Sequence, residues 1–131
     1  MRCYVDISTD FKGGIGRGSG QASVLIWTDY KGRRSEAGPY TVSVENETRN
    51  RLAIMAVNEA LKHFTRPGQE IIIRMREAYV KANLQYLDGW HEKDYKKAGG
   101  KTVANSDEWR KLWMLKQSQN ISVEIVEDAA V

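Results

Sequence analysis

The sequence predicts a single α/β domain in which a five-stranded mixed sheet is flanked by helices. Three observations predict it. Short strand-like segments fill the first third of the chain, a segment with helical periodicity follows, and a run of three isoleucines then indicates a buried strand. A length of 131 residues suits one compact domain, and no linker, internal repeat or low-complexity segment divides it. We therefore expect residues 1–131 to form one domain.

The first third of the chain predicts an antiparallel meander of three strands. Residues 2–9 are rich in β-branched and aromatic side chains, and residues 21–32 form a second segment of this kind. Residues 36–45 alternate between apolar and polar positions, which is typical of a half-buried strand. A turn at residues 31–34 joins the last two segments, so we expect these strands to pair in an antiparallel arrangement.

A glycine-rich stretch, residues 10–20, separates the first two strands. Its glycines are Gly13, Gly14, Gly16, Gly18 and Gly20. A dinucleotide-binding loop requires Gly-x-Gly-x-x-Gly between a strand and a helix, whereas this spacing differs and a strand follows. The pattern favours a flexible hairpin loop, from which Arg17 could still contact a phosphate.

The middle of the chain predicts a helix followed by a buried strand. Residues 48–64 carry apolar side chains at three- and four-residue steps, and the Arg-Pro-Gly sequence at residues 66–68 ends the helix. The isoleucine run within residues 69–76 fits a central, partly parallel strand. Two arginines, Arg74 and Arg76, stand where this strand should emerge from the core.

The last third of the chain predicts two more helices and a final strand. Residues 77–87 have the periodicity of a short helix, and residues 89–105 form a basic, aromatic and irregular segment. Residues 105–108 resemble a helix-capping sequence, which we expect to start a helix through residues 109–116. Residues 121–127 alternate and predict the last strand.

The composition permits anionic partners without requiring them. The net charge is +3 and the sequence pI is about 9.0. The single cysteine, Cys3, lies in an apolar context, so we expect a packed thiol in a reducing compartment. The sequence contains no apolar run near 18 residues and no recognisable leader. These features favour a cytoplasmic protein that does not contact membranes.

Four phrases in this order resemble ribonuclease HI, of the ribonuclease H-like superfamily. They are YVDIST before the glycine-rich loop, TRNRLAIMA, REAYV, and the basic segment GWHEKDYKKAGGKTVANSDEWRKL. The resemblance covers nearly the whole chain. It implies a ribonuclease H-like fold, in which three antiparallel strands are followed by parallel strands, here with the C-terminal helix of the family absent.

The resemblance also implies where a catalytic site would lie. The family hydrolyses the RNA strand of RNA–DNA hybrids with two Mg²⁺ ions, which four carboxylates hold because hard cations prefer anionic oxygen ligands. The first aspartate falls on Asp6, whereas the second and third carboxylates fall on Ala53 and Arg76. The fourth would lie on a helix beyond Val131. The resemblance therefore implies a catalytically degenerate protein that needs no metal cofactor.

We expect Arg76 to pair with Asp6 and to fill the vacated metal position, because a guanidinium there would repel Mg²⁺. The alternative is that Arg76 turns to solvent. Arg74, two residues earlier, is interpreted as an ordinary exposed edge residue.

A rearranged set of carboxylates would keep the protein active with Mg²⁺ or Mn²⁺. The substitutes are Glu77 and Asp128, with Asp10 as a further candidate. Glu77 is one residue from Arg76, and one step along a strand reverses the face, so it points inward only if the strand end bends.

The resemblance further implies a set of nucleic-acid contacts. The candidates are Arg17, Thr48, Arg49, Asn50, Trp90, Lys93, Lys96, Lys97 and Lys101. Lysines neutralise phosphates and aromatic faces pack on sugars or bases. Ala78 stands where the family has a glutamine, so one minor-groove contact is lost. The alternative for the basic segment is a solvated loop whose Trp90 packs on the helices.

Three functions follow. The first is a module that binds RNA–DNA hybrid or duplex nucleic acid without two-metal hydrolysis. The second is a protein-interaction module, or a homodimer, that covers the sheet surface left bare by the absent helix. The third is an active metal-dependent endoribonuclease on RNA–DNA hybrids. The first is the function that we favour at this point.

Overall fold

The computed structural model describes residues 2–131 and contains one five-stranded sheet. The strands follow the order β3-β2-β1-β4-β5 across the sheet. β1 pairs with β2 and β2 with β3 in antiparallel fashion, whereas β1 with β4 and β4 with β5 are parallel. The mixed sheet of a ribonuclease H-like fold is thereby confirmed. The strands are β1 (Arg2–Lys12), β2 (Gly18–Tyr30), β3 (Arg33–Glu47), β4 (Glu70–Met75) and β5 (Ser122–Glu127).

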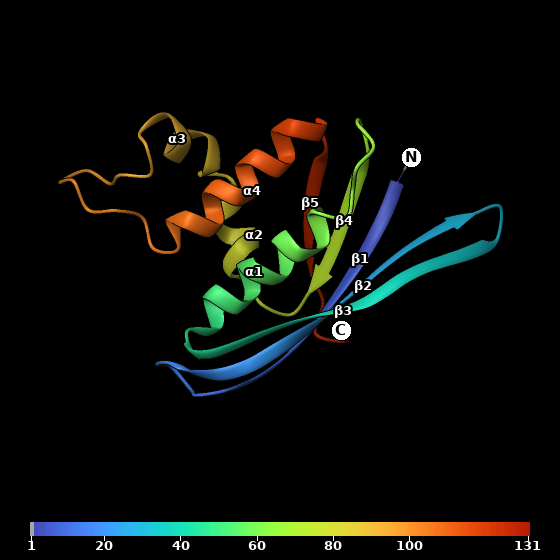
Figure 1. The fold of residues 1–131 in the computed structure, drawn as a ribbon, viewed down its shortest axis with the longest axis horizontal. Coiled ribbons are helices and arrows are strands. Elements are labelled where there is room, and N and C mark those ends of the chain that lie inside the picture. Colours follow the sequence, from blue (N-terminus) through green and yellow to red (C-terminus); the bar gives the residue numbers. More distant parts are fainter. Residues whose placement is uncertain (1) are drawn as a thin grey trace.

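The helices gather on one side of this sheet, as Figure 1 shows. They are α1 (Arg49–Leu61), α2 (Tyr79–Leu84), α3 (Leu87–Glu92) and α4 (Ser106–Gln119). In the described part of the chain no helix follows β5, and none covers the opposite surface, which we call the open face. None of the helices in residues 2–131 combines the length and the apolar character that crossing a membrane requires.

The helices after β4 differ in detail from the expectation. The stretch predicted as one helix over residues 77–87 forms α2, a turn at Gln85 and Tyr86, and then α3, which extends to Glu92 within the segment expected to be irregular. α4 begins after Asn105 as the capping sequence predicts, but Asn105 adopts a left-handed backbone and does not cap with its side chain. Its side-chain amide donates instead to the Tyr79 hydroxyl at 3.1 Å.

The core lies between the helix side of the sheet and the helices α1 and α4. Along β1 the odd-numbered residues Cys3, Val5 and Ile7 are buried, because alternate side chains of a strand face opposite ways. Trp109 and Leu112 of α4 are fully buried against this layer. The expectation that Cys3 is a packed thiol is confirmed.

The glycine-rich stretch forms a hairpin, as predicted, but a tighter one than residues 10–20. β1 continues to Lys12 and β2 begins at Gly18, so Asp10 belongs to the strand. A Cβ atom at Gly20 would approach the Phe11 Cα to 2.8 Å, and one at Gly18 would approach the Gly13 Cα to 2.6 Å. These glycines therefore allow two backbones to come close together.

Candidate functional site

The ends of β1 and β4 define the candidate site, because the two strands are parallel and finish at the same edge of the sheet. Asp6 is level with Arg74, and Ile7 is level with Met75. The residues that follow, Asp10 in β1 and Glu77 after β4, therefore lie at that common edge. In open α/β sheets this carboxyl-end edge is where ligands usually bind.

Asp6 pairs with Arg74 and not with Arg76, so the expected Asp6–Arg76 ion pair is wrong. The Arg74 Nε and Nη2 atoms donate to the two Asp6 carboxylate oxygens at 2.7 and 2.8 Å. The exposed Arg76 donates its Nη2 to the backbone carbonyl of Ala129 at 3.3 Å. The register of β1 against β4 explains the difference, because it places Arg74 directly beside Asp6 on the same face.

Arg74 is therefore a central residue of the open face and not an ordinary edge residue. Besides holding Asp6, it lies 3.7 Å from the Asp128 carboxylate and 5.9 Å from the centre of the Trp27 ring. The Trp27 indole N–H donates to Asp6 Oδ2 at 3.1 Å. The hydrogen bonds that Arg74 donates to the Asp6 carboxylate raise the pKa of the Arg74 guanidinium, which stays charged.

An aromatic pair extends this cluster across the open face. The rings of Tyr4 and Trp27 stack with their centres 4.3 Å apart, and the Arg34 guanidinium lies 4.1 Å from the Trp27 ring centre. Sequence analysis missed these contacts, because they depend on the pairing of β1 with β2. The alternation of Tyr4 and Asp6 along β1 was the one signal that the two side chains share a face.

Glu77 turns inward, which the strict alternation of a strand would not predict. β4 ends at Met75, so the chain bends before Glu77, and the Thr9 hydroxyl donates to its Oε2 atom. Only 8% of Glu77 is exposed, and its Oε1 atom has no hydrogen-bond partner. Asp10 is exposed at the end of β1, whereas Asp128 lies beside Arg74 and accepts from the backbone N–H of Ala130.

The residues at this edge do not fit two Mg²⁺ ions. Ala53, where the resemblance places a carboxylate, is fully buried in α1 and offers no oxygen ligand from its side chain. Arg76 brings a positive charge to the position of the third carboxylate. Across residues 2–131, no three side chains of His, Cys, Asp or Glu lie close enough together to hold a metal ion. A pair of divalent cations requires more anionic oxygens than this.

The start of α1 collects four of the predicted nucleic-acid contacts. The Thr48 hydroxyl caps the helix by accepting from the Arg51 backbone N–H at 3.1 Å. Arg49 and Asn50 follow in the first turn and are exposed, and the turn contains no acidic residue. Arg17 reaches this point from the β1–β2 hairpin. The helix terminus therefore combines exposed basic side chains with the positive end of the helix dipole.

Arg17 and Arg49 are both held by neighbouring residues. Arg17 donates to the backbone carbonyl of Asn46 at 2.8 Å and lies 3.7 Å from the Glu47 carboxylate. The Arg49 guanidinium lies 4.9 Å from the centre of the Phe11 ring. These contacts orient both guanidinium groups at the beginning of α1.

An ion pair joins the start of α1 to the start of α4. Arg51 donates from both terminal nitrogens to the Asp107 carboxylate, at 2.9 and 2.6 Å. This hydrogen bonding lowers the pKa of Asp107 to about 2. Because the basic segment ends just before α4, the ion pair also ties that segment to the beginning of α1.

The four lysines of the basic segment are exposed and carry free charge. Within residues 2–131, Lys93, Lys96, Lys97 and Lys101 form no ion pair. A bridge between Lys96 and Thr102 closes the segment into a hairpin.

Two aromatic residues of the segment are packed into the protein. Tyr95 is fully buried, and the half-buried Trp90 lies edge-on to Trp109, with 5.3 Å between the ring centres. The packing of Trp90 on the helices matches the alternative for this residue, so its contact with nucleic acid stays a prediction.

Comparison with known proteins gives the family. The family model described as RNase H matches residues 1–128. A Ribonuclease H of Xanthomonas euvesicatoria pv. vesicatoria (strain 85-10) is 34% identical over 122 residues, which is 90% of this chain and 75% of the relative.

Two solved structures share the fold at low sequence identity. LC9-RNase H1, described as a type 1 RNase H with the type 2 active-site motif, matches with a TM-score of 0.73 and 19% identity, over 98% of this chain and 64% of that one. LC11-RNase H1 in complex with RNA/DNA hybrid matches with a TM-score of 0.63 and 18% identity, over 95% of this chain and 84% of that one. The family match over nearly the full length and this common fold lead to one conclusion: the chain belongs to the RNase H family.

Proposed function

We propose that this protein binds the backbone of RNA–DNA hybrid or duplex nucleic acid and does not hydrolyse it by a two-metal mechanism. One contrast carries the proposal. Within residues 2–131 no three His, Cys, Asp or Glu side chains are grouped to hold a metal ion, whereas the basic residues around the starts of α1 and α4 remain exposed.

Phosphate chemistry supports the binding half of the proposal. The N-terminus of α1, whose first turn contains no acidic residue, favours an anion, and Arg17 and Arg49 flank it. The basic segment, whose lysines form no ion pair within residues 2–131, lies at the same end of the molecule as the start of α1 in Figure 1. Together these groups can contact several phosphates, and such contacts do not depend on the base sequence.

The residues at the strand ends support the non-catalytic half. Ala53 supplies no ligand, Arg76 adds positive charge, and Asp6 is engaged by Arg74. Because relatives are named Ribonuclease H, enzymatic activity is tested as the alternative. An RNA–DNA hybrid is the ligand to use, since LC11-RNase H1 was solved in complex with one.

The deciding experiment combines a binding assay with a cleavage assay on the same labelled RNA–DNA hybrid. We expect binding that weakens steeply as salt rises, and no cleavage with either Mg²⁺ or Mn²⁺. Cleavage that is retained in every carboxylate variant indicates a contaminating nuclease. Cleavage that disappears in Asp10→Asn or Glu77→Gln would overturn the non-catalytic half and leave the binding half intact.

One observation favours the active enzyme as a second candidate. Glu77 is nine-tenths buried and its Oε1 atom lacks a partner, so a carboxylate oxygen is available at the carboxyl-end edge. The exposed Asp10 is at the same edge. The cleavage assay with Glu77→Gln, and with Asp6→Asn as the comparison on the open face, distinguishes this candidate.

The open face favours a third candidate, a protein partner or a homodimer. It carries the Tyr4–Trp27 stack and the exposed Val126, and no helix of residues 2–131 covers it. Light scattering tests this candidate, since a monomer at micromolar concentration argues against the homodimer.

A further inference from the structure

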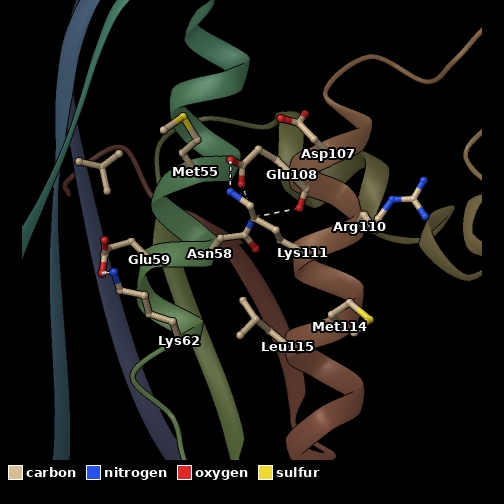
Figure 2. A pocket seen from close by; sticks show the side chains of 11 residues that line it. Met55, Asn58, Glu59, Lys62, Asp107, Glu108, Arg110, Lys111, Met114 and Leu115 are labelled. Carbon is tan, nitrogen blue, oxygen red and sulfur yellow. Dashed lines mark hydrogen bonds and ion pairs between the residues drawn. The ribbon is translucent and has the colours of Figure 1, made fainter.

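A groove between α1 and α4 has no part in the proposed nucleic-acid binding. Figure 2 shows the side chains of the two helices that line it. Its volume is ≈ 710 Å³, within the usual range for small-molecule sites. Val42 of β3 closes one side, so the groove is bounded by two helices and the sheet.

Asn58 lies at the floor of this groove with its side-chain orientation fixed. Its Nδ2 atom donates to the backbone carbonyl of Glu108 at 2.9 Å and to Glu108 Oε2 at 2.8 Å. Both neighbours are acceptors, so the amide nitrogen must face them. The Oδ1 atom then points away from Glu108, is buried, and has no hydrogen-bond partner. A buried acceptor of this kind requires a donor.

Two acidic side chains of the groove lie deeper than their basic partners. The carboxylate side chains are the sheltered ones, with 5% of Glu108 and 18% of Glu59 exposed. Their partners reach in from the rim, where 57% of Lys62 and 65% of Lys111 are exposed. The floor therefore presents acceptors and negative charge, and the cations that balance it are mobile side chains at the surface.

The walls of the groove are apolar and adaptable. Met55 of α1 and Met114 and Leu115 of α4 line it together with Val42. Thioether side chains have several rotatable bonds and adjust to ligands of different shapes.

We propose that this groove binds a small organic ammonium ion with an apolar body. The ammonium group donates to Asn58 Oδ1 and to the Glu108 carboxylate, while Lys111 swings out to solvent. The apolar body lies against Met55, Met114 and Leu115. A ligand with only acceptor groups cannot satisfy Asn58, and a carboxylate would meet the charge of Glu108.

Three ligands of equal length test the proposal on the full chain: hexylammonium, hexanol and hexanoate. Titration followed by ¹H–¹⁵N NMR should shift the side-chain amide signals of Asn58 with hexylammonium, at a Kd of about 1 mM for so small a ligand. Hexanol should bind more weakly and hexanoate not at all. Equal shifts with hexanoate, or no shift of Asn58 with hexylammonium at about 10 mM, would overturn the proposal and would mean that the site holds only water.

Two lysine substitutions with the same charge change separate the groove from a general charge effect. Met114→Lys adds a cation at the rim, where Met114 is largely exposed, and should weaken hexylammonium binding about fivefold, through repulsion and through loss of the Met114 contact. Val126→Lys adds the same charge on the open face and should leave the Kd unchanged. Equal weakening by both variants would contradict a site in the groove. Because both positions are exposed, both variants should fold.

Discussion

Arg74 shows most clearly how one side chain can organise a surface. Its guanidinium contacts Asp6 through two hydrogen bonds, approaches Asp128, and lies near the Trp27 ring that Asp6 also holds. Arg76, only two residues later, contacts a single backbone carbonyl. Two arginines that look equivalent in the sequence therefore make very different contacts in the structure.

We expect Arg74→Ala to destabilise the protein more than Arg76→Ala. Removal of Arg74 leaves the sheltered Asp6 carboxylate without a cationic partner and with only the Trp27 N–H bonded to it. We expect a cost of about 1–2 kcal/mol, less than for a fully buried ion pair, because Asp6 and Arg74 are partly exposed. Arg76→Ala, an exposed position, should change the free energy of unfolding by less than about 0.5 kcal/mol. Urea denaturation of both variants measures the difference, and equal effects would contradict the central position of Arg74.

A second residue-scale prediction concerns the pH dependence of the Arg51–Asp107 ion pair. Hydrogen bonding from Arg51 lowers the pKa of Asp107 from 3.8 to about 2, so the ionised carboxylate is favoured in the folded state. Its stabilising contribution is fully present above about pH 4 and is lost as the pH falls through about 2.

We therefore expect Asp107→Asn to reduce stability at neutral pH by about 0.5–1 kcal/mol, a small effect because Asp107 is exposed. Near pH 2 the difference from the wild type should vanish. Denaturation curves at several pH values measure it. A difference that stays constant down to pH 2 would show that the ion pair has no part in it.

At the scale of elements, the β1–β2 hairpin depends on glycines at particular positions. A Cβ atom at Gly20 would meet the backbone of β1, whereas one at Gly16, in the loop, would meet nothing within 4 Å. Gly20→Ala should therefore destabilise the protein by about 1–3 kcal/mol. Gly16→Ala is the matched control. It should be neutral or slightly stabilising, because alanine lowers the conformational entropy of the unfolded chain and meets no atom in the folded one. Thermal unfolding compares the two, and equal melting temperatures would contradict the close approach.

The sequence predicts local features well and pairing across strands poorly. The apolar steps of α1 and the isoleucines of β4 are local signals, and both elements formed where periodicity placed them. The partner of Asp6 depends on the parallel register of β1 and β4, which no local pattern encodes. A shift of two residues in that register would have placed Arg76 beside Asp6.

Strand periodicity could not predict the inward orientation of the Glu77 side chain, for a related reason. It follows from the end of β4 at Met75, after which alternation no longer governs the side chain. The Asn58–Glu108 contact in the groove joins residues 50 positions apart in sequence, so periodicity alone could not reveal it.

At the scale of the whole molecule, the separation of surfaces explains how one small domain offers several sites. The starts of α1 and α4 and the basic segment lie at one end, the groove lies farther along the same two helices, and the open face is on the other side of the sheet. Because α1 and α4 serve both the basic end and the groove, variants for one site must be checked against the other.

The basic end gives the last prediction, which concerns the salt dependence of binding. Lys96 and Lys97 are exposed and form no ion pair within residues 2–131, so each can release counterions from a phosphate. Each such contact contributes about 0.9 to the slope of log affinity against log salt. The double variant Lys96→Ala, Lys97→Ala should therefore bind a labelled hybrid more weakly at low salt and with a slope reduced by about 2.

The control is the single-lysine variant Lys116→Ala in the last turn of α4, at the opposite end of that helix from the basic segment. It removes one charge from the protein without removing a predicted phosphate contact, so the slope should stay the same. Filter binding over a series of salt concentrations measures all three proteins. If Lys116→Ala lowers the slope as much per lysine as the double variant does, binding responds to net charge alone. The basic segment would then have no specific part in holding the nucleic acid, even though the protein binds it.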